Sequence, residues 1–229
     1  MTTSVAPSVV IKLGGSLTRQ DAPRALLARI AAGRGRVVVP GGGALADAVR
    51  AVQPQWGLGD GAAHRMALLA MEQMAHAMHH IAPALLPART PHEILSAAAA
   101  GTALWFPAAM TLGAPDIAES WDVTSDSLAA WLARRLGAHR LVLVKAPGLA
   151  LPAPASGRTA TLERLTAAGI VDAAFATMAR GFEGDIVVVR ADDDDAIAAA
   201  LRTDLQPCDE QGAAPGGRAP QSGGDERAS

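Results

Sequence analysis

Near its start, the sequence has a strand-forming run that ends in an uncommon way. Residues Val9–Leu13 are apolar apart from Lys12, and the run breaks directly into Gly14, Gly15 and Ser16. Such a run is typical of a buried parallel strand, in which a lysine is costly unless its amine reaches a cleft or a partner. The glycines permit a sharp turn with free N–H groups, and amides beside an ammonium form a cradle for an anion such as phosphate. The alternative is an ordinary turn with Lys12 extended to solvent.

The same order of features occurs a second time. Another strand-forming run, Arg36–Pro40, is followed at once by Gly41, Gly42 and Gly43 and then by a helical pattern over Ala44–Val52. Strands that alternate with helices predict an α/β fold with a mainly parallel sheet. Ligands of such sheets bind beyond the carboxyl ends of the strands, where both glycine loops lie. A plain tight turn into a helix is the alternative for the three glycines.

The rest of the chain continues this alternation. Asp21 is expected to cap a first helix that has Pro23 in its first turn. An irregular region after residue 81 is expected to hold two short strands, Glu93–Leu95 and Ala103–Phe106, with a short helix between them. The other expected elements are helices over 62–81, up to 136, over 161–168, over 172–179 and over 192–202, and strands over 140–144 and 185–190.

Length and composition fit a single domain of this kind over residues 9–202. Residues 1–8 lack periodicity, and we expect them to be disordered. We expect the same of residues 203–229, because this segment has too little apolar surface to order itself. The net charge of −2 gives no indication of a nucleic-acid partner. Cys208 is the only cysteine, which excludes an intrachain disulfide and a cysteine metal site. Because no signal sequence or membrane-spanning run is evident, we expect a cytoplasmic protein without membrane contact.

Two aspartates precede the helix that ends near residue 136. Asp122 and Asp126 lie four residues apart, on one side of a helix start. With Lys12 and two glycine cradles, they suit two phosphates held end to end, and phosphoryl transfer needs mainly positioning and neutralisation of charge. Helix capping is the alternative, and it fits Asp122 better than Asp126. The run Asp192–Asp195 is expected to begin a helix rather than to bind a metal.

Three motifs, in their order and spacing, resemble those of the amino acid kinase superfamily. They are Lys-Leu-Gly-Gly-Ser at 12–16, Pro-Gly-Gly-Gly at 40–43 and Thr-Ser-Asp at 124–126. The resemblance covers residues 9–202 and implies a three-layer αβα sandwich that uses ATP with Mg²⁺ to phosphorylate a carboxylate or a phosphate. It implies catalytic roles for Lys12 and Asp126, with Asp126 orienting Lys12, and we predict no protein ligand to a metal. The residues implied for the nucleotide are Gly14, Gly15, Ser16, Asp122, Lys145 and Gly148, and those for the acceptor are Gly41, Gly42, Gly43, His64 and Arg65.

Within the superfamily, the stretches 121–130 and 64–71 resemble the small kinases of methanofuran biosynthesis. Those enzymes phosphorylate [5-(aminomethyl)furan-3-yl]methyl phosphate, which carries a phosphate and an ammonium at opposite ends. His64 and Arg65 are expected to neutralise the phosphate, with simple exposure as the alternative. The acids considered for the ammonium are Asp60, Glu72 and Asp122, with a solvated surface position as the alternative for Glu72. We also expect a homo-oligomer.

Two features of many superfamily members are missing. Lys145–Gly148 reads Lys-Ala-Pro-Gly in place of Thr-Asp-Val-x-Gly, and no lysine follows Lys145 where many members have a late catalytic one. Arg180 is considered as its replacement, with a surface role as the alternative. Lys145 is either a nucleotide contact or a strand-end lysine that reaches solvent. A non-catalytic nucleotide- or oxyanion-binding protein and a kinase for isopentenyl phosphate or uridylate therefore stay open as alternatives.

Overall fold

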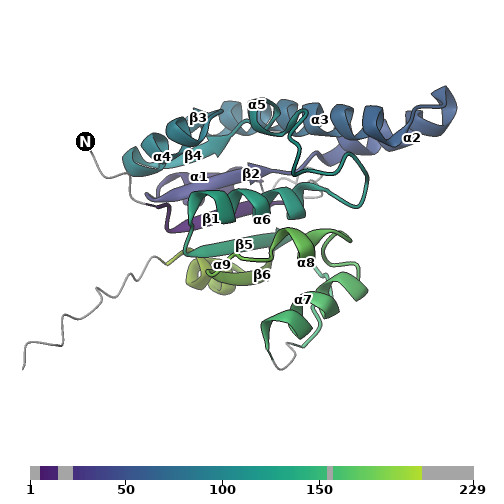
Figure 1. The fold of residues 1–229 in the computed structure, drawn as a ribbon. Coiled ribbons are helices and arrows are strands. Elements are labelled where there is room, and N and C mark those ends of the chain that lie inside the picture. Colours follow the sequence, from purple (N-terminus) through teal and green to yellow (C-terminus); the bar gives the residue numbers. More distant parts are fainter. Residues whose placement is uncertain (1–5, 15–22, 154–156, 203–229) are drawn as a thin grey trace, which may run out of the picture.

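A computed structural model describes residues 6–14, 23–153 and 157–202 of the chain. Its centre is a six-stranded sheet in which every strand pairing is parallel, with the order β3-β4-β2-β1-β5-β6 (Figure 1). The strands are β1 (Val9–Leu13), β2 (Arg36–Pro40), β3 (Leu85–Ala88), β4 (Thr102–Trp105), β5 (Arg140–Lys145) and β6 (Asp185–Arg190). The helices are α1 (Pro23–Ala31), α2 (Gly43–Trp56), α3 (Asp60–Ile81), α4 (Pro91–Ala100), α5 (Ala108–Thr111), α6 (Ser125–Leu136), α7 (Arg158–Ala167), α8 (Phe175–Met178) and α9 (Asp194–Leu201).

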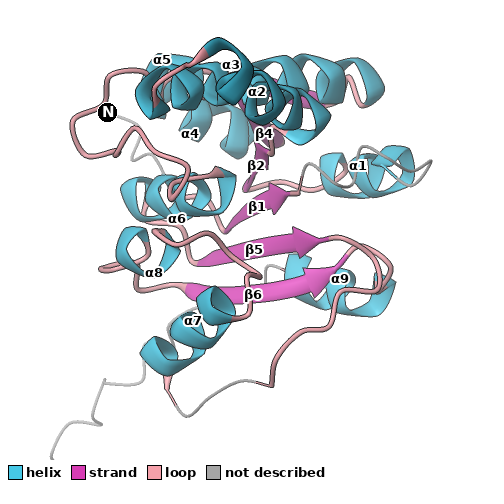
Figure 2. Cartoon of the chain, turned by 90° about the vertical axis from the view of Figure 1, so that its right-hand side faces the viewer, coloured by secondary structure: helices cyan, strands magenta, loops and turns pink. Residues whose placement is uncertain are grey.

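The sheet separates two layers of helices, because side chains of successive strand residues point to opposite faces. In β1, Val10 belongs to a core shared with α4, α6 and α8, whereas Val9 and Ile11 belong to a core shared with α1 and α9. Figure 2 shows α6 and α8 on one side of the sheet and α1 and α9 on the other. The expected αβα sandwich is therefore confirmed.

Helices α2 and α3 pack against each other beside β2. Figure 1 shows α2 and the first part of α3 projecting beyond the end of the sheet. Gly57, with a φ of 61°, ends α2 in the left-handed conformation that favours glycine. The predicted helix over Ala44–Val52 is longer in the structure, because Pro54 is accommodated within α2. The two helices reach past the carboxyl end of β2, where the acceptor was expected to bind.

One sequence expectation about the irregular region is wrong. Glu93–Leu95 is not a strand but part of α4, where the Thr90 side chain accepts a hydrogen bond from the Glu93 N–H and Pro91 occupies the first turn. The strand is Leu85–Ala88 instead, although it contains Pro87. Because β3 is at the edge of the sheet, the missing N–H of Pro87 need not remove a ladder hydrogen bond.

Several expectations fall on residues outside the described ranges. These residues are Gly15, Ser16, Asp21 and the segment 203–229. Of the predicted N-terminal segment 1–8, residues 6–8 are described, and the Ser8 N–H donates to the Gly35 carbonyl at 2.8 Å. None of the helices in the described ranges combines the length and apolar character needed to cross a bilayer.

Candidate active site

A buried cluster of three charged side chains lies at the carboxyl end of β1. Lys12 Nζ is 2.8 Å from Asp126 Oδ1, and Lys145 Nζ is 2.7 Å from Asp126 Oδ2. We call Lys12, Asp126 and Lys145 the charge centre. All three residues are less than 10% exposed. With both lysines protonated, the centre carries one net positive charge, which suits an anionic ligand such as a phosphoryl group.

The sheet register brings the two lysines together. Lys12 of β1 pairs with Leu143 of β5, two residues before Lys145. Since side chains alternate along a strand, Lys12 and Lys145 share the face of the sheet that also bears Val10 and Leu143. Helix α6 covers this face, and its first turn contains Asp126. The carboxylate therefore lies between the two ammonium groups.

Lys12 and Lys145 are the only lysines in the 229-residue sequence, whose other 18 basic residues are arginines. An arginine stays protonated in proteins and has a large planar head group, whereas a lysine is compact and its pKa shifts when it is buried. The chain thus uses lysine only at the charge centre.

Burial and mutual interaction shift the pKa values of the charge centre. Burial, and next the nearby charge of Lys12, lower the pKa of Lys145 to about 8, although Asp126 opposes the shift. Burial by itself would raise the pKa of Asp126, but the ammonium groups of Lys12 and Lys145 hold this pKa below its ordinary value. Asp126 is therefore ionised at neutral pH, and the proton on Lys145 is held less tightly than on a free lysine.

A second carboxylate, Asp172, holds the beginning of α6 in place. Its Oδ2 accepts hydrogen bonds from the backbone N–H of Thr124 and of Ser127, both at 3.0 Å, and from the Thr124 hydroxyl at 2.7 Å. Its Oδ1 accepts a hydrogen bond from the Ser127 hydroxyl. These contacts satisfy amides that a helix start leaves without intrahelical partners. Asp172 was expected within a helix over 172–179, but it precedes α8, and no local motif signals its role.

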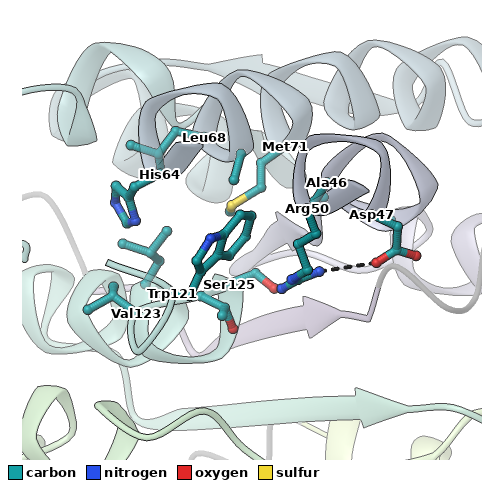
Figure 3. Close-up of a pocket in the computed structure, with 14 residues that line it drawn as sticks. Ala46, Asp47, Arg50, His64, Leu68, Met71, Trp121, Val123 and Ser125 are labelled. Atoms are coloured by element: carbon teal, nitrogen blue, oxygen red, sulfur yellow. Dashed lines mark hydrogen bonds and ion pairs between the residues drawn. The ribbon is translucent and has the colours of Figure 1, made fainter. Parts of the chain in front are cut away.

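A cavity of about 280 Å³ lies between α2, α3 and the start of α6, the helix whose first turn contains Asp126 (Figure 3). Its floor and walls combine apolar side chains with a few polar ones. Trp121 lies across the cavity, its indole N–H donates to Gln53 Oε1 at 2.6 Å, and the Arg50 guanidinium lies 4.3 Å from the ring centroid. The lining residues are Gly42, Gly43, Ala46, Asp47, Arg50, His64, Ala67, Leu68, Met71, Trp121, Val123, Thr124, Ser125 and Leu128.

The two glycine loops contribute unequally to the site. The Gly14 N–H donates to the Val144 carbonyl and the Gly41 N–H to the Leu13 carbonyl, so these amides extend the sheet and are not free for a phosphate. Gly42 and Gly43 line the cavity at the start of α2, where the first amides have no intrahelical acceptor. Gly43 has a φ of 57°, which disfavours other residues. A Cβ on Gly42 would lie 2.5 Å from the Ala46 Cβ.

The structure separates the other predicted site residues. His64 lines the cavity, whereas the exposed Arg65 forms an ion pair with Glu119 at 2.6 Å and is not part of the lining. Asp122 is exposed and lies outside the lining, and the Gly148 N–H donates to Asp192 at 3.2 Å. Among the described residues, no three His, Cys, Asp or Glu side chains gather into a possible metal site. Arg50 and Trp121 line the cavity although sequence analysis assigned them no role in the site.

Comparisons with known proteins agree with this architecture. The model of the amino acid kinase family matches residues 7–148, more than half of the chain. The chain therefore belongs to the amino acid kinase family. A search among curated proteins found no match.

Solved structures show the same fold at low sequence identity. UMP kinase from Ureaplasma parvum is 16% identical with a TM-score of 0.62, over 84% of this chain and 93% of that one. Uridylate kinase from Archaeoglobus fulgidus is 17% identical with a TM-score of 0.59, over 80% and 90% of the two chains. Aspartate kinase from Synechocystis is 16% identical with a TM-score of 0.60, over 82% of this chain and 38% of that one.

Proposed function

We propose that the protein transfers the γ-phosphoryl group of ATP to the phosphate of a small acceptor, [5-(aminomethyl)furan-3-yl]methyl phosphate in methanofuran biosynthesis. The observation that carries this proposal is the charge centre beside a small cavity. Thr124 and Ser125 line the cavity and directly precede Asp126 in the chain. An acceptor in the cavity would therefore present its phosphate near both lysines.

The chemistry follows from charge and position. An oxygen of the acceptor phosphate forms a bond to the γ-phosphorus while the bond from that phosphorus to the β,γ-bridging oxygen breaks, which leaves ADP and a diphosphate. Lys12 and Lys145 stabilise the negative charge on the transferring group, and Asp126 fixes both ammonium groups without a reorganisation cost during the reaction. Lys145 thereby supplies the second cation, which many superfamily members provide with a lysine late in the chain.

The acceptor phosphate has a complementary place at the start of α2. The first amides of a helix attract anions, and Gly42 and Gly43 bring the backbone to the cavity without side chains. Mg²⁺, bound by the ATP phosphates, would supply further positive charge, as this ion commonly does in kinases. The exposed Arg180 donates no side-chain contact to the charge centre, so Lys145 is the better candidate for the missing cation.

The size and lining of the cavity favour a single-ring acceptor. Its volume of about 280 Å³ is just below the roughly 300–1,000 Å³ typical of small-molecule sites. Trp121, Leu68 and Met71 offer apolar surface for a ring. This favours the furan phosphate over uridylate, which carries a sugar and a base.

The test is to incubate the protein with ATP, Mg²⁺ and each of the three phosphates, and to follow ADP release and diphosphate formation by phosphorus NMR. We expect turnover with the furan phosphate and much less with the other two. ATP binding without ADP release from any acceptor would support the alternative of a non-catalytic nucleotide-binding protein. The homo-oligomer stays a prediction, which sedimentation analysis would check.

A further inference from the structure

One side chain of the cavity has a hydrogen-bonding group that the described residues leave unused. His64 is 2% exposed and lines the cavity. Its Nδ1 lies 3.0 Å from the backbone carbonyl oxygen of Ser120. Its Nε2 is buried and has no hydrogen-bond partner in the described part of the chain. A buried polar atom without a partner normally calls for an explanation, such as a bound ligand.

The contact with Ser120 decides what His64 offers to a ligand. A carbonyl oxygen only accepts hydrogen bonds, so His64 Nδ1 must carry the proton. Burial lowers the pKa of His64 below its ordinary value, although the Ser120 carbonyl and Glu119 oppose the shift, so the ring is neutral at physiological pH. In a neutral imidazole with a protonated Nδ1, the other nitrogen carries a lone pair. His64 Nε2 is therefore an acceptor.

The neighbours of His64 do not supply the matching donor. Leu68 and Val123, which lie near the ring in Figure 3, are apolar. Among the described lining residues, Arg50 is the only cationic side chain; it lies on the other side of Trp121 in the same view and contacts the indole ring and Asp47. The two polar sides of the cavity therefore differ in chemistry. The start of α2 offers donors, whereas the His64 side offers an acceptor.

We propose that the His64 side of the cavity binds a hydrogen-bond donor, an ammonium or hydroxyl group, at the end of the substrate opposite its phosphate. This inference deepens the proposed function and rests on it for the phosphate end. It also revises the expectation that His64 neutralises the acceptor phosphate, because a lone pair repels a phosphate dianion. His64 becomes a specificity-determining residue that selects for the far end of the substrate.

Binding measurements on wild type and two matched variants test this inference without relying on turnover. The probes are [5-(aminomethyl)furan-3-yl]methyl phosphate, its hydroxymethyl analogue and its ethyl analogue, which has nearly the same shape but no donor. In His64→Asn, the side-chain amide can still donate to the Ser120 carbonyl, but nothing replaces Nε2. In His64→Gln, the longer amide can place a carbonyl oxygen near the position of Nε2. Calorimetry gives the affinity for each probe, and thermal unfolding verifies that each variant folds.

We expect the wild type to bind the amine or the alcohol about 10- to 100-fold more tightly than the ethyl analogue, the range for a hydrogen bond from a neutral or a charged donor. His64→Asn should reduce this preference to within about twofold while the ethyl analogue binds as before. His64→Gln should retain part of the preference. Whichever of the aminomethyl and hydroxymethyl probes shows the larger preference over the ethyl analogue identifies the donor as an ammonium or a hydroxyl group.

Equal binding of all three probes by the wild type, or an unchanged preference in His64→Asn, would overturn the inference. So would nitrogen NMR of the unmodified protein if it showed the His64 proton on Nε2, and this measurement needs no variant that folds. A preference that depends on His64 without ADP release from any probe would overturn the proposed function and support the donor site. Failure of all three probes to bind would overturn the inference.

Discussion

The charge centre and the His64 side of the cavity treat buried polar groups in opposite ways. At the charge centre, Asp126 contacts both Lys12 and Lys145, so each charge has a partner of opposite sign within 2.8 Å. At His64, one ring nitrogen is bound to the Ser120 carbonyl and the other has no partner among the described residues. The residues of the charge centre are charged, whereas His64 is neutral.

The difference reflects what each kind of burial costs. Burying an unpaired charge costs roughly several kcal/mol, so the fold must supply a partner of opposite charge even before a ligand binds. A neutral acceptor without a partner costs only about 1–3 kcal/mol. A site can therefore keep a neutral acceptor open for its substrate, but it must hold its charged groups together.

The largest effect is expected for Asp126→Asn, which removes the shared carboxylate and leaves two ammonium groups side by side. We expect the free energy of unfolding at pH 7 to fall by about 3–5 kcal/mol, the range for breaking a buried ion pair. Denaturant unfolding measures this change. Asp185→Asn is the control, because its pair with Arg140 is at the surface, 3.6 Å long, and should matter by less than about 0.5 kcal/mol. Equal stability of the two variants would contradict a charge centre held by Asp126.

Lys12→Ala should separate catalysis from folding. Asp126 keeps Lys145 as its partner, so stability should fall much less than in Asp126→Asn. Turnover should fall by at least about 100-fold, the scale for one lost electrostatic contact to the transition state. ADP release at saturating substrates measures this. Arg135→Ala, which removes a cation paired with Asp116 at the far end of α6, should keep the wild-type rate. A near-normal rate for Lys12→Ala would refute its assignment.

The pKa of Lys145 predicts a pH dependence of both activity and stability. If the reaction needs the Lys145 ammonium, kcat/KM should decline as pH rises through about 8. The pKa of Lys145 in the folded protein is lower than the ordinary lysine value of about 10.4. Between these two pH values, Lys145 is therefore protonated more often in the unfolded chain than in the folded one. The contribution of Lys145 to stability therefore increases as pH rises from about 8 to about 10.

This prediction can be checked directly because the sequence has only two lysines. Isotope-labelled lysine should give two side-chain NMR signals, and Lys145→Arg identifies which of them belongs to Lys145. We expect the Lys145 signal to titrate near 8 and the alkaline decline in kcat/KM to disappear in Lys145→Arg, provided that variant is active. Titration of Lys145 near pH 10 would contradict the shifted pKa.

A smaller effect is expected for Asp172→Ala, which leaves the charges of the charge centre in place but loosens the start of α6. The lost hydrogen bonds to Thr124 and Ser127 should cost about 1–3 kcal/mol of stability and lower kcat about tenfold through misplacement of Asp126. Asp193→Ala is a matched control, because Asp193 caps α9 with a bond to the Ala196 N–H at 2.9 Å. It should cost about 1 kcal/mol and leave kcat unchanged. Equal kcat values for the two variants would argue against a positioning role.

The sequence predicted most of the sheet and two of the three residues of the charge centre. Periodicity located β1, β2, β5 and β6, and the motifs around Lys12 and Asp126 singled out both residues. The role of Lys145 was left open because it depends on the register between β1 and β5, which local patterns do not specify. Glu93–Leu95 was misassigned because its apolar residues suit a helix or a strand equally, and the cap at Thr90 decided the outcome.

The sequence predicted where the cavity lies but not which hydrogen-bonding groups its lining offers. Gly42, Gly43 and the first part of α3 were expected to enclose the acceptor, and a cavity lies there. The role of His64, however, depends on the backbone carbonyl of Ser120, which is 56 residues away in sequence. Every residue has a carbonyl, so no residue type marks this one. The same limit applies to Asp172, whose partners lie 45–48 residues away.

The smallest effect is expected for the acids that the sequence offered as partners of the substrate ammonium. Glu72 accepts a hydrogen bond from the Ala108 N–H at 2.9 Å, Asp60 accepts one from Gln53 Nε2 at 2.9 Å, and Asp122 is exposed. None of the three lines the cavity. Glu72→Gln, Asp60→Asn and Asp122→Asn should therefore change the preference for the aminomethyl over the ethyl phosphate by less than about twofold, because removing a charge affects only the substrate it contacts.

His64→Asn provides the comparison for these three variants, since it should abolish the preference that they retain. The measurement is the ratio of the two binding constants in each variant, so that general losses of affinity cancel. Glu72→Gln weakens the acceptor of the Ala108 N–H at the start of α5, and any loss of stability would show in its unfolding temperature rather than in this ratio. If one acid variant lost the preference and His64→Asn kept it, the ammonium would be recognised by a carboxylate. The contrast between paired charges and an open neutral acceptor would then not describe this site.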